Sequence, residues 1–294
     1  MEQIIRNQPR ADKKKKLSFD SILGIPYYVF LVVFVIFPLL IMMLYAFTSN
    51  AQANIFNIRF SFENFGIFLT SDYVFKSLLE SIWLAILSTL LCLAICYPLA
   101  FMVSRLKRRT QTILVLFLTA SMWINSLILI HSLKNVFLLA GNLVVGFDKS
   151  FPANAIFLGH DYSIIIGMIF LYFPYMFLPI YTQMTKIDEN LFEGAADLGA
   201  NKFQTIFRVV VPLTLSSVFS SCLVVLLPAT TTLVVPEILT SGNRKMIGNL
   251  IEFLYNESQF GQMAAVALVL TVSLLIIVGI MKLLNRYEEV LSND

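Results

Sequence analysis

Six long stretches of the chain are almost entirely apolar, and polar or charged residues gather in the segments between them. They cover approximately residues 21–47, 81–104, 110–133, 162–185, 209–236 and 261–281. A membrane-crossing helix needs about 20 mostly apolar residues, so each stretch is long enough. Because only helices and closed barrels satisfy every backbone group inside lipid, we expect an all-α fold, a polytopic membrane bundle with six transmembrane helices. Prolines that should kink these helices are Pro38, Pro98, Pro174, Pro179 and Pro228.

The composition narrows the class of protein further. The 294 residues are 58% hydrophobic with a mean hydropathy of +0.80, and only 13% are charged. These values exclude an ordinary soluble enzyme, a disordered protein and a disulfide-rich scaffold. A net charge of +3 is too small to indicate nucleic-acid binding. The three cysteines lie inside apolar stretches and should pack there, although Cys92 and Cys96 share a helix face and leave a metal or redox pair conceivable.

Basic residues predict the orientation of the chain in the membrane. They concentrate in residues 1–20, in the turn at 105–109, in the loop at 186–208 and after residue 281, which are alternate connections. Since positively charged loops stay in the cytoplasm, both termini are assigned to that side. We therefore expect a basic cytoplasmic tail (1–20), a six-span domain (21–285) and a second cytoplasmic tail (286–294). The lysines of the first tail could also bind anionic membrane lipid.

One predicted cytoplasmic loop, residues 186–211, is patterned as folded structure. Asn190 is a good helix N-cap and Glu193 completes a capping-box-like pair. Gly199 stands where a left-handed C-cap is wanted, and a second helix should begin near Asn201 and present Phe203. So short a helix is marginal alone and must pack on something, either its own bundle or a soluble partner.

The same loop carries a resemblance to a known family. The stretch Glu193-Gly194-Ala195-Ala196-Asp197-Leu198-Gly199, followed by Val211-Pro212, resembles the coupling-loop signature of the inner-membrane permeases of ABC importers. The chain departs from the family pattern at Gly194, Val209 and Val211, which are small or apolar exchanges. The resemblance implies the type I permease fold, and it implies that the loop, with Phe203 and Pro212, docks on a cytoplasmic ATPase.

Further blocks resemble the permeases of spermidine/putrescine importers. They are Trp123 to Leu127 with Lys134, Tyr172 to Thr214, Ile247 to Asn249, and Phe260 with Gly261. This likeness implies a permease subunit in a bacterial inner membrane that moves polyamines into the cell. It also implies a second permease, two ATPase subunits and an extracytoplasmic binding protein as partners. Alternatives are a permease for a sugar, sulfate or ferric ion, or a stand-alone secondary transporter or channel.

The chain itself lacks the residues for energy conversion. It has no G-x-x-x-x-G-K-[ST] phosphate loop, so ATP-Mg must bind to the partner ATPase, and no cofactor is expected here. It has only two histidines, His131 and His160, and no metal-binding or catalytic motif built on them. We therefore expect a transport subunit and not an enzyme.

A polycationic substrate needs hydrogen-bond acceptors or aromatic faces along its path. Polar and aromatic residues inside or near the spans are the candidates: Trp123, Asn125, Ser126, Tyr172, Tyr175, Thr231 and Glu237. Each has an ordinary alternative, because aromatic residues anchor span ends and hydroxyls join helices. No carboxylate falls near the middle of a span, which fits an importer whose affinity resides in its external binding protein. It fits a sugar or anion permease equally well.

Overall fold

The structure is a computed structural model that describes residues 26–48, 60–145, 154–242 and 246–291. These residues are almost entirely helical, and the extended backbone among them is an isolated bridge between Thr48 and Phe60. The first predicted tail, residues 1–20, lies outside the described residues. In the last predicted tail the backbone is helical, because α14 continues past residue 285 to Leu291.

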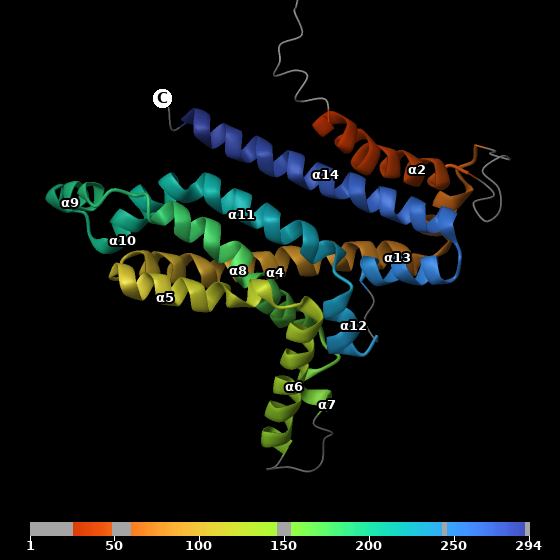
Figure 1. Cartoon of the computed structure of the whole chain (residues 1–294), viewed down its shortest axis with the longest axis horizontal. Helices are drawn as coiled ribbons and strands as arrows, with labels where there is room; N and C mark the ends of the chain where they lie inside the picture. The colour runs from red at the N-terminus through yellow and green to blue at the C-terminus, as the bar shows by residue number, and fades with distance from the viewer. Residues whose placement is uncertain (1–25, 49–59, 146–153, 243–245, 292–294) are drawn as a thin grey trace, which may run out of the picture.

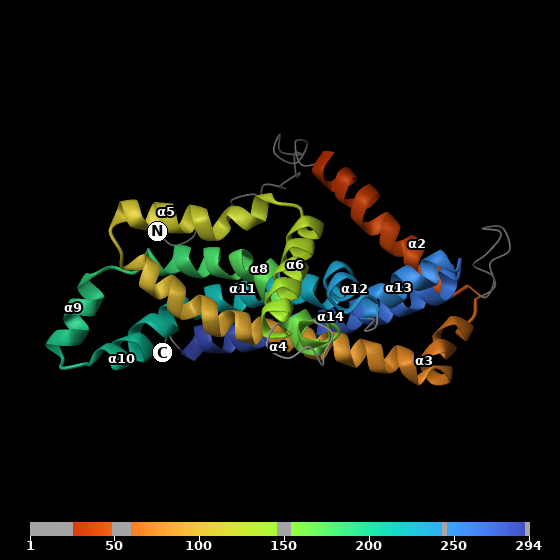
Figure 2. The ribbon, with the colours of Figure 1, turned by 90° about the horizontal axis from the view of Figure 1, so that it is seen from below.

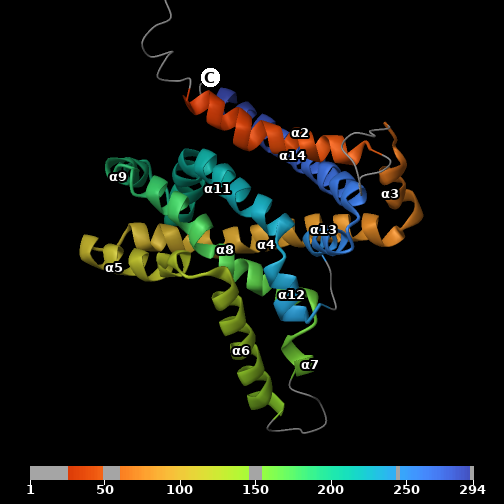
Figure 3. The same ribbon diagram turned by 45° about the vertical axis from the view of Figure 1, so that its right-hand side comes forward.

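Long helices lie side by side and form the body of the molecule (Figure 1). At its centre α4 (Asp72–Ser104), α8 (Asp161–Met184) and α11 (Val211–Thr231) pack against one another. α14 (Phe260–Leu291) lies along α2 (Phe37–Ala46) on one side, and α5 (Arg108–Thr119) lies along α4 and α8 on the other (Figures 2 and 3). Among the described residues, six helices are long and apolar enough to cross a membrane: Pro26–Ala46, Asp72–Ser104, Ser126–Val144, Asp161–Met184, Lys202–Thr231 and Phe260–Leu283.

Short helices complete the connections between these long ones. η2 (Glu63–Gly66) and α3 (Ile67–Thr70) precede α4 in the chain, and η3 (Ala120–Trp123) follows α5. α6 (Ser126–Val145) lies between η3 and α7 (Asn154–Phe157) in the chain. The other short helices are α9 (Asn190–Asp197), α10 (Lys202–Thr205), α12 (Val234–Thr240) and α13 (Ile247–Asn256).

The third predicted span, 110–133, is wrong in its bounds. The helix begins as α5, tightens into the single 3-10 turn η3 and stops, because Ile124 is extended (φ −98°, ψ 141°). α6 then starts anew, and the Asn125 side chain accepts a hydrogen bond from the Leu127 amide at 2.8 Å. Asparagine at such a position begins a new helix instead of continuing the old one. As a result α6 runs across the direction of α4, α8 and α11 (Figures 1 and 3).

The fifth predicted span, 209–236, also differs at its end. α11 stops at Thr231, Thr232 is extended (φ −62°, ψ 135°), and Pro236 belongs to the separate helix α12. At its other end α11 is continuous with α10 through the π-helical turn η4 (Ile206–Val210). A similar π-turn, η1 (Val32–Ile36), precedes Pro38, as η4 precedes Pro212. The wider turn makes room for a proline ring that would otherwise press on the carbonyl four residues earlier.

The core between α4, α8 and α11 holds all three cysteines. Cys92, Cys96 and Cys222 are buried together with Met176 and Phe177. The Sγ atoms of Cys92 and Cys96 lie 3.8 Å apart, and the described residues contain no group of three metal-ligating side chains. Their burial in this apolar cluster is the packing that small apolar residues adopt.

Candidate functional site

The loop at 186–211 folds into the short helix α9 and the start of the next long helix. The predicted cap is wrong, because Asn190 is the first helical residue and the N-cap residue is Glu189. The side chain of Asp188 takes the capping role and accepts the Asn190 amide at 3.0 Å. An ionised carboxylate is a stronger acceptor than the Asn190 amide oxygen, and its negative charge favours the N-terminus of a helix.

The end of α9 confirms the prediction for Gly199. This residue has φ +78°, its amide donates to the Ala196 carbonyl at 2.8 Å, and the Ala200 amide donates to the Ala195 carbonyl at 3.0 Å. These two bonds form a Schellman motif, which requires a left-handed residue at the position of Gly199. The chain is thereby turned sharply between α9 and α10.

A reciprocal capping box begins the second helix. The Asn201 side chain accepts the Gln204 amide at 2.9 Å, and the Gln204 side chain accepts the Asn201 amide at 2.8 Å. The helix that starts here runs without interruption through α10, η4 and α11 to Thr231. The predicted second helix near Asn201 is thus confirmed, and a capped corner joins α9 directly to a long central helix.

The outer face of this loop is apolar and open. Leu198, Phe203 and Phe207 are 90%, 74% and 68% exposed. Gly194, Asp197 and Pro212 are also exposed, Glu193 and Ala196 are exposed toward the pocket on the inner face of α9, and Ala195 is half-buried. A Cβ atom added at Gly194 would meet nothing within 4 Å, so this part of the helix lies bare. Exposed aromatic and aliphatic side chains gathered in one place are typical of a binding surface.

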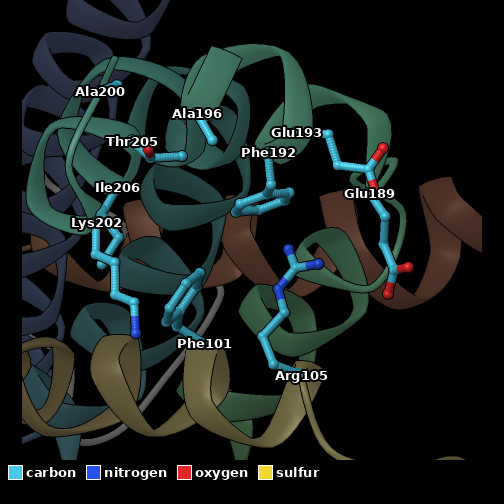
Figure 4. A pocket seen from close by; sticks show the side chains of 10 residues that line it. All are labelled: Phe101, Arg105, Glu189, Phe192, Glu193, Ala196, Ala200, Lys202, Thr205 and Ile206. Carbon is cyan, nitrogen blue, oxygen red and sulfur yellow. The ribbon is translucent and has the colours of Figure 1, made fainter. Parts of the chain in front are cut away.

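The inner face of α9 borders a pocket of about 570 Å³ against the end of α4 (Figure 4). Here the Arg105 guanidinium lies over the Phe192 ring, 4.0 Å from its centre, and 5.6 Å from the centre of the Phe101 ring. Partial burial lowers the pKa of the Arg105 guanidinium, and the negative charge of Glu189 partly opposes this shift. The sequence identifies Arg105 only as one of the basic residues that predict the orientation in the membrane, and it gives Phe192 no role. Nothing local in the sequence indicates that these two residues meet.

Basic residues surround this end of the bundle. Figure 1 places α9, α10 and the start of α5 at the same end, toward which the last part of α14 also points. The exposed cations in these segments are Arg105, Lys107, Arg108, Arg109, Lys186, Lys202, Arg208 and Lys282. The described segments that the charge pattern groups on one side of the membrane therefore gather toward one end of the bundle.

A second cavity, of about 470 Å³, lies between α8, α11 and the start of α6. Three predicted pathway residues line it, namely Ser126, Tyr172 and Tyr175, and Thr232 joins them at the break after α11. The Tyr172 hydroxyl donates to the Pro228 carbonyl at 3.1 Å. The cavity thus presents aromatic faces, hydroxyl groups and a backbone carbonyl.

The remaining pathway candidates lie elsewhere. Trp123 is 78% exposed, and the Asn125 side chain is occupied by the start of α6. The Thr231 hydroxyl bonds back to its own helix, and Glu237 is exposed in the first turn of α12. The structure therefore does not bring these four residues into the cavity with the two tyrosines.

Comparison with known proteins identifies the family. The model of the family described as "Binding-protein-dependent transport system inner membrane component" matches residues 96–287. The chain belongs to this family. It is therefore a multi-pass membrane protein and a transport component, as the six apolar helices also indicate.

Several known proteins are similar to this chain over most of their length. The spermidine/putrescine transport system permease protein PotB of Haemophilus influenzae is 34% identical over 266 residues, which cover 88% of this chain and 93% of that protein. PotB of Escherichia coli is 31% identical over 273 residues, covering 88% and 96%. A homologue of PotB in Mycoplasma pneumoniae is 26% identical over 82% of each chain.

Solved structures show the fold. A chain of a bacterial ABC transporter that imports the acidic polysaccharide alginate superimposes with a TM-score of 0.75 at 17% identity, covering 93% of this chain and 98% of that one. The same kind of transporter in complex with an alginate pentasaccharide-bound periplasmic protein gives a TM-score of 0.74 at 16% identity. The ABC importer permease fold expected from the sequence is thereby confirmed.

Proposed function

We propose that the chain is the permease subunit of an ATP-driven importer of polyamines such as spermidine and putrescine, and that Glu193 to Gly199 couples it to a partner ATPase. The observation that carries this proposal is the 186–211 loop. It is a rigidly capped corner with a bare apolar face, and it continues directly into the long helix that ends at Thr231. A push on α9 would therefore reach the centre of the bundle.

The arrangement of charges supports a cytoplasmic position for this loop. The loop shares its end of the bundle with the basic turn Arg105 to Arg109, and the last part of α14 points toward the same end. Positively charged connections stay in the cytoplasm, which is where an ATPase could reach the loop. On this orientation both termini are cytoplasmic, and the break between α11 and α12 faces the outside.

The proposal divides the work among several subunits. The chain has no phosphate loop, so two ATPase subunits would bind and hydrolyse ATP-Mg, and this chain would need no cofactor. The family description and the alginate transporter complex support delivery by an extracytoplasmic binding protein. Six helices would form half of the membrane part, and a second related permease would form the other half.

The cavity at Tyr172 supports a path for small cations. Tyrosine rings attract ammonium groups through their faces, and the hydroxyls of Ser126 and Thr232 can accept hydrogen bonds from them. Among the described lining residues there is no carboxylate, so an amine would bind weakly and leave again. The same features also suit an uncharged sugar, which keeps a permease for another solute as the second candidate.

Reconstitution tests the proposal. The chain would be purified with its ATPase, second permease and binding protein and placed in liposomes, and labelled spermidine and putrescine would be followed. ATP-dependent uptake that unlabelled polyamines inhibit, and sugars, sulfate and ferric ion do not, is expected. Inhibition by one of those solutes instead would identify the other substrate class. Uptake by this chain without any ATPase would refute the coupling proposal and favour a secondary transporter or channel.

The orientation needs a separate experiment. A single cysteine would replace exposed Leu198 in a background without Cys92, Cys96 and Cys222, and membrane-impermeant maleimide would be applied to vesicles of both orientations. We expect labelling only in inside-out vesicles. Labelling in right-side-out vesicles would place the loop outside the cell.

A further inference from the structure

Helix α9 has little that holds it to the rest of the molecule. It is eight residues long, and of its side chains only those of Phe192 and Ala195 are even half-buried. Phe192 is the larger of the two, and it packs against the buried cluster between α4, α8 and α11. The way in which Phe192 is held therefore decides how α9 is attached.

Arg105 supplies the contact on the other side of the Phe192 ring. Its backbone closes the last turn of α4, where its amide donates to the Met102 carbonyl at 3.2 Å. Its side chain reaches toward α9, so that the guanidinium lies 4.0 Å from the centre of the Phe192 ring and 5.6 Å from that of Phe101 (Figure 4). The end of α4 thus holds α9 through one cation placed between two rings.

The chemistry of this contact suits a joint that moves. A guanidinium is planar and always charged, and it remains attracted to a ring face over a range of lateral positions, whereas a bidentate ion pair demands one geometry. Glu189, in the turn before α9, adds a negative charge near Arg105. The link can therefore persist while α9 tilts against α4.

We infer that Arg105 is a positioning residue for coupling, which passes displacement of α9 to the end of α4 by holding Phe192. This inference rests on the proposed function, in which an ATPase moves α9. It adds a second route to the one through α10 and α11, because α4 packs along both α8 and α11 in the centre of the bundle. Breaking the contact should leave the ATPase bound and active but reduce the substrate moved per ATP.

The test measures that ratio in the complete reconstituted transporter. Arg105→Ala is expected to lower the substrate imported per ATP about two- to fivefold, which corresponds to the worth of an exposed cation–π contact. Arg105→Lys keeps the charge without the planar group and should fall in between. Arg108→Ala is the matched control, because Arg108 is an exposed cation of the same basic turn without a ring partner among the described residues.

A double-mutant cycle assigns the effect to the pair. If Arg105 acts through Phe192, the double variant Arg105→Ala with Phe192→Leu should lose no more than the larger single loss. A readout without transport is trypsin cleavage after the exposed Lys186 and Lys202, which flank α9. We expect faster cleavage at both sites in Arg105→Ala and no change in Arg108→Ala, because a loosened α9 opens more often.

The outcomes separate two failures. If the wild-type complex shows no ATP-dependent uptake, the proposed function is wrong. If it does, and Arg105→Ala assembles normally with an unchanged ratio of uptake to ATP, the inference about Arg105 is wrong while the proposed function stands. Additive losses in the cycle would also overturn it. Should Arg105→Ala fail to assemble, the ratios of Arg105→Lys and Phe192→Leu decide in the same way.

Discussion

The Schellman turn at Gly199 allows the link between the shape of the loop and coupling to be tested by changing one backbone angle. Gly199 has φ +78°, and a Cβ atom added there would meet nothing within 4 Å. An alanine at this position would therefore fit in space, and its only cost would be the left-handed backbone. Asparagine tolerates that conformation far better than alanine does, so Gly199→Ala and Gly199→Asn differ mainly in this one property.

The size of the effect follows from the helix that the turn terminates. A left-handed alanine costs about 1–2 kcal/mol. Helix α9 has eight residues and is marginal without its caps, so little else compensates for this loss. A cost of about 1–2 kcal/mol changes the ratio of capped to frayed loop by a factor of roughly 5–30. Coupling that requires the capped loop should fall by a similar factor in Gly199→Ala and remain near wild type in Gly199→Asn.

The assay is uptake by proteoliposomes that contain the full transporter, measured together with ATP hydrolysis and with co-purification of the ATPase. Hydrogen exchange at the Gly199 and Ala200 amides, which close the turn, reports the conformation directly. Gly199→Asp adds a negative charge to the exposed face of the loop as well, and it should abolish uptake while membrane insertion stays intact. Equal uptake in the alanine and asparagine variants, with faster exchange only in the alanine variant, would refute the reasoning, because the turn would then open without consequence.

Three other substitutions test the helix packing, the loop and the cavity. Gly248→Ala would place a Cβ atom 2.7 Å from the Thr231 carbonyl oxygen, and overpacking against backbone should cost about 1–3 kcal/mol, seen as a lower unfolding temperature than that of the open control Gly279→Ala. Gly194→Ala fills an open helical position and should stabilise α9 by about 0.5–1 kcal/mol, measured as slower hydrogen exchange of the α9 amides than in the wild type. Tyr172→Phe removes the hydroxyl that donates to the Pro228 carbonyl, a hydrogen bond worth about 1 kcal/mol. The expected result is a lower initial rate of uptake at low substrate concentration, with unchanged binding of the ATPase.

Local signals predicted the parts of the loop that depend on local chemistry. Gly199 was recognisable because a helix that ends in a left-handed turn almost requires glycine. The cap at Asn190 was mispredicted because the Asp188 side chain accepts the amide of Asn190 itself, so the helix already includes Asn190 and its N-cap residue is Glu189. Nothing in the sequence pairs Arg105 with Phe192, since their contact arises only when α4 and α9 meet at one end of the bundle.

Apolarity predicted where the chain enters lipid but not where helices break inside it. Residues 110–133 contain no Asp, Glu, Lys or Arg, so hydropathy cannot register the extended Ile124 or the side-chain bond of Asn125. The same limit applies to the pathway residues. Ser126 lines the cavity together with the two tyrosines, whereas the side chain of its neighbour Asn125 accepts the Leu127 amide at the start of α6. At a helix break, two adjacent residues can therefore differ in whether their side chains face the cavity.

The contact between Arg105 and Phe192 also allows a prediction of how often the chain crosses the bilayer between them. Both residues lie at the same end of the bundle, so α5, α6 and α8 together must cross an even number of times. α8 crosses once, which leaves one crossing for α5 and α6 combined. α6 satisfies the criteria of length and apolarity, yet it runs across the central helices, whereas α5 lies alongside α4 and α8. We therefore expect the third crossing to be made by α5 with η3, whereas α6, which packs against α12, projects away from the middle of the bundle (Figure 1).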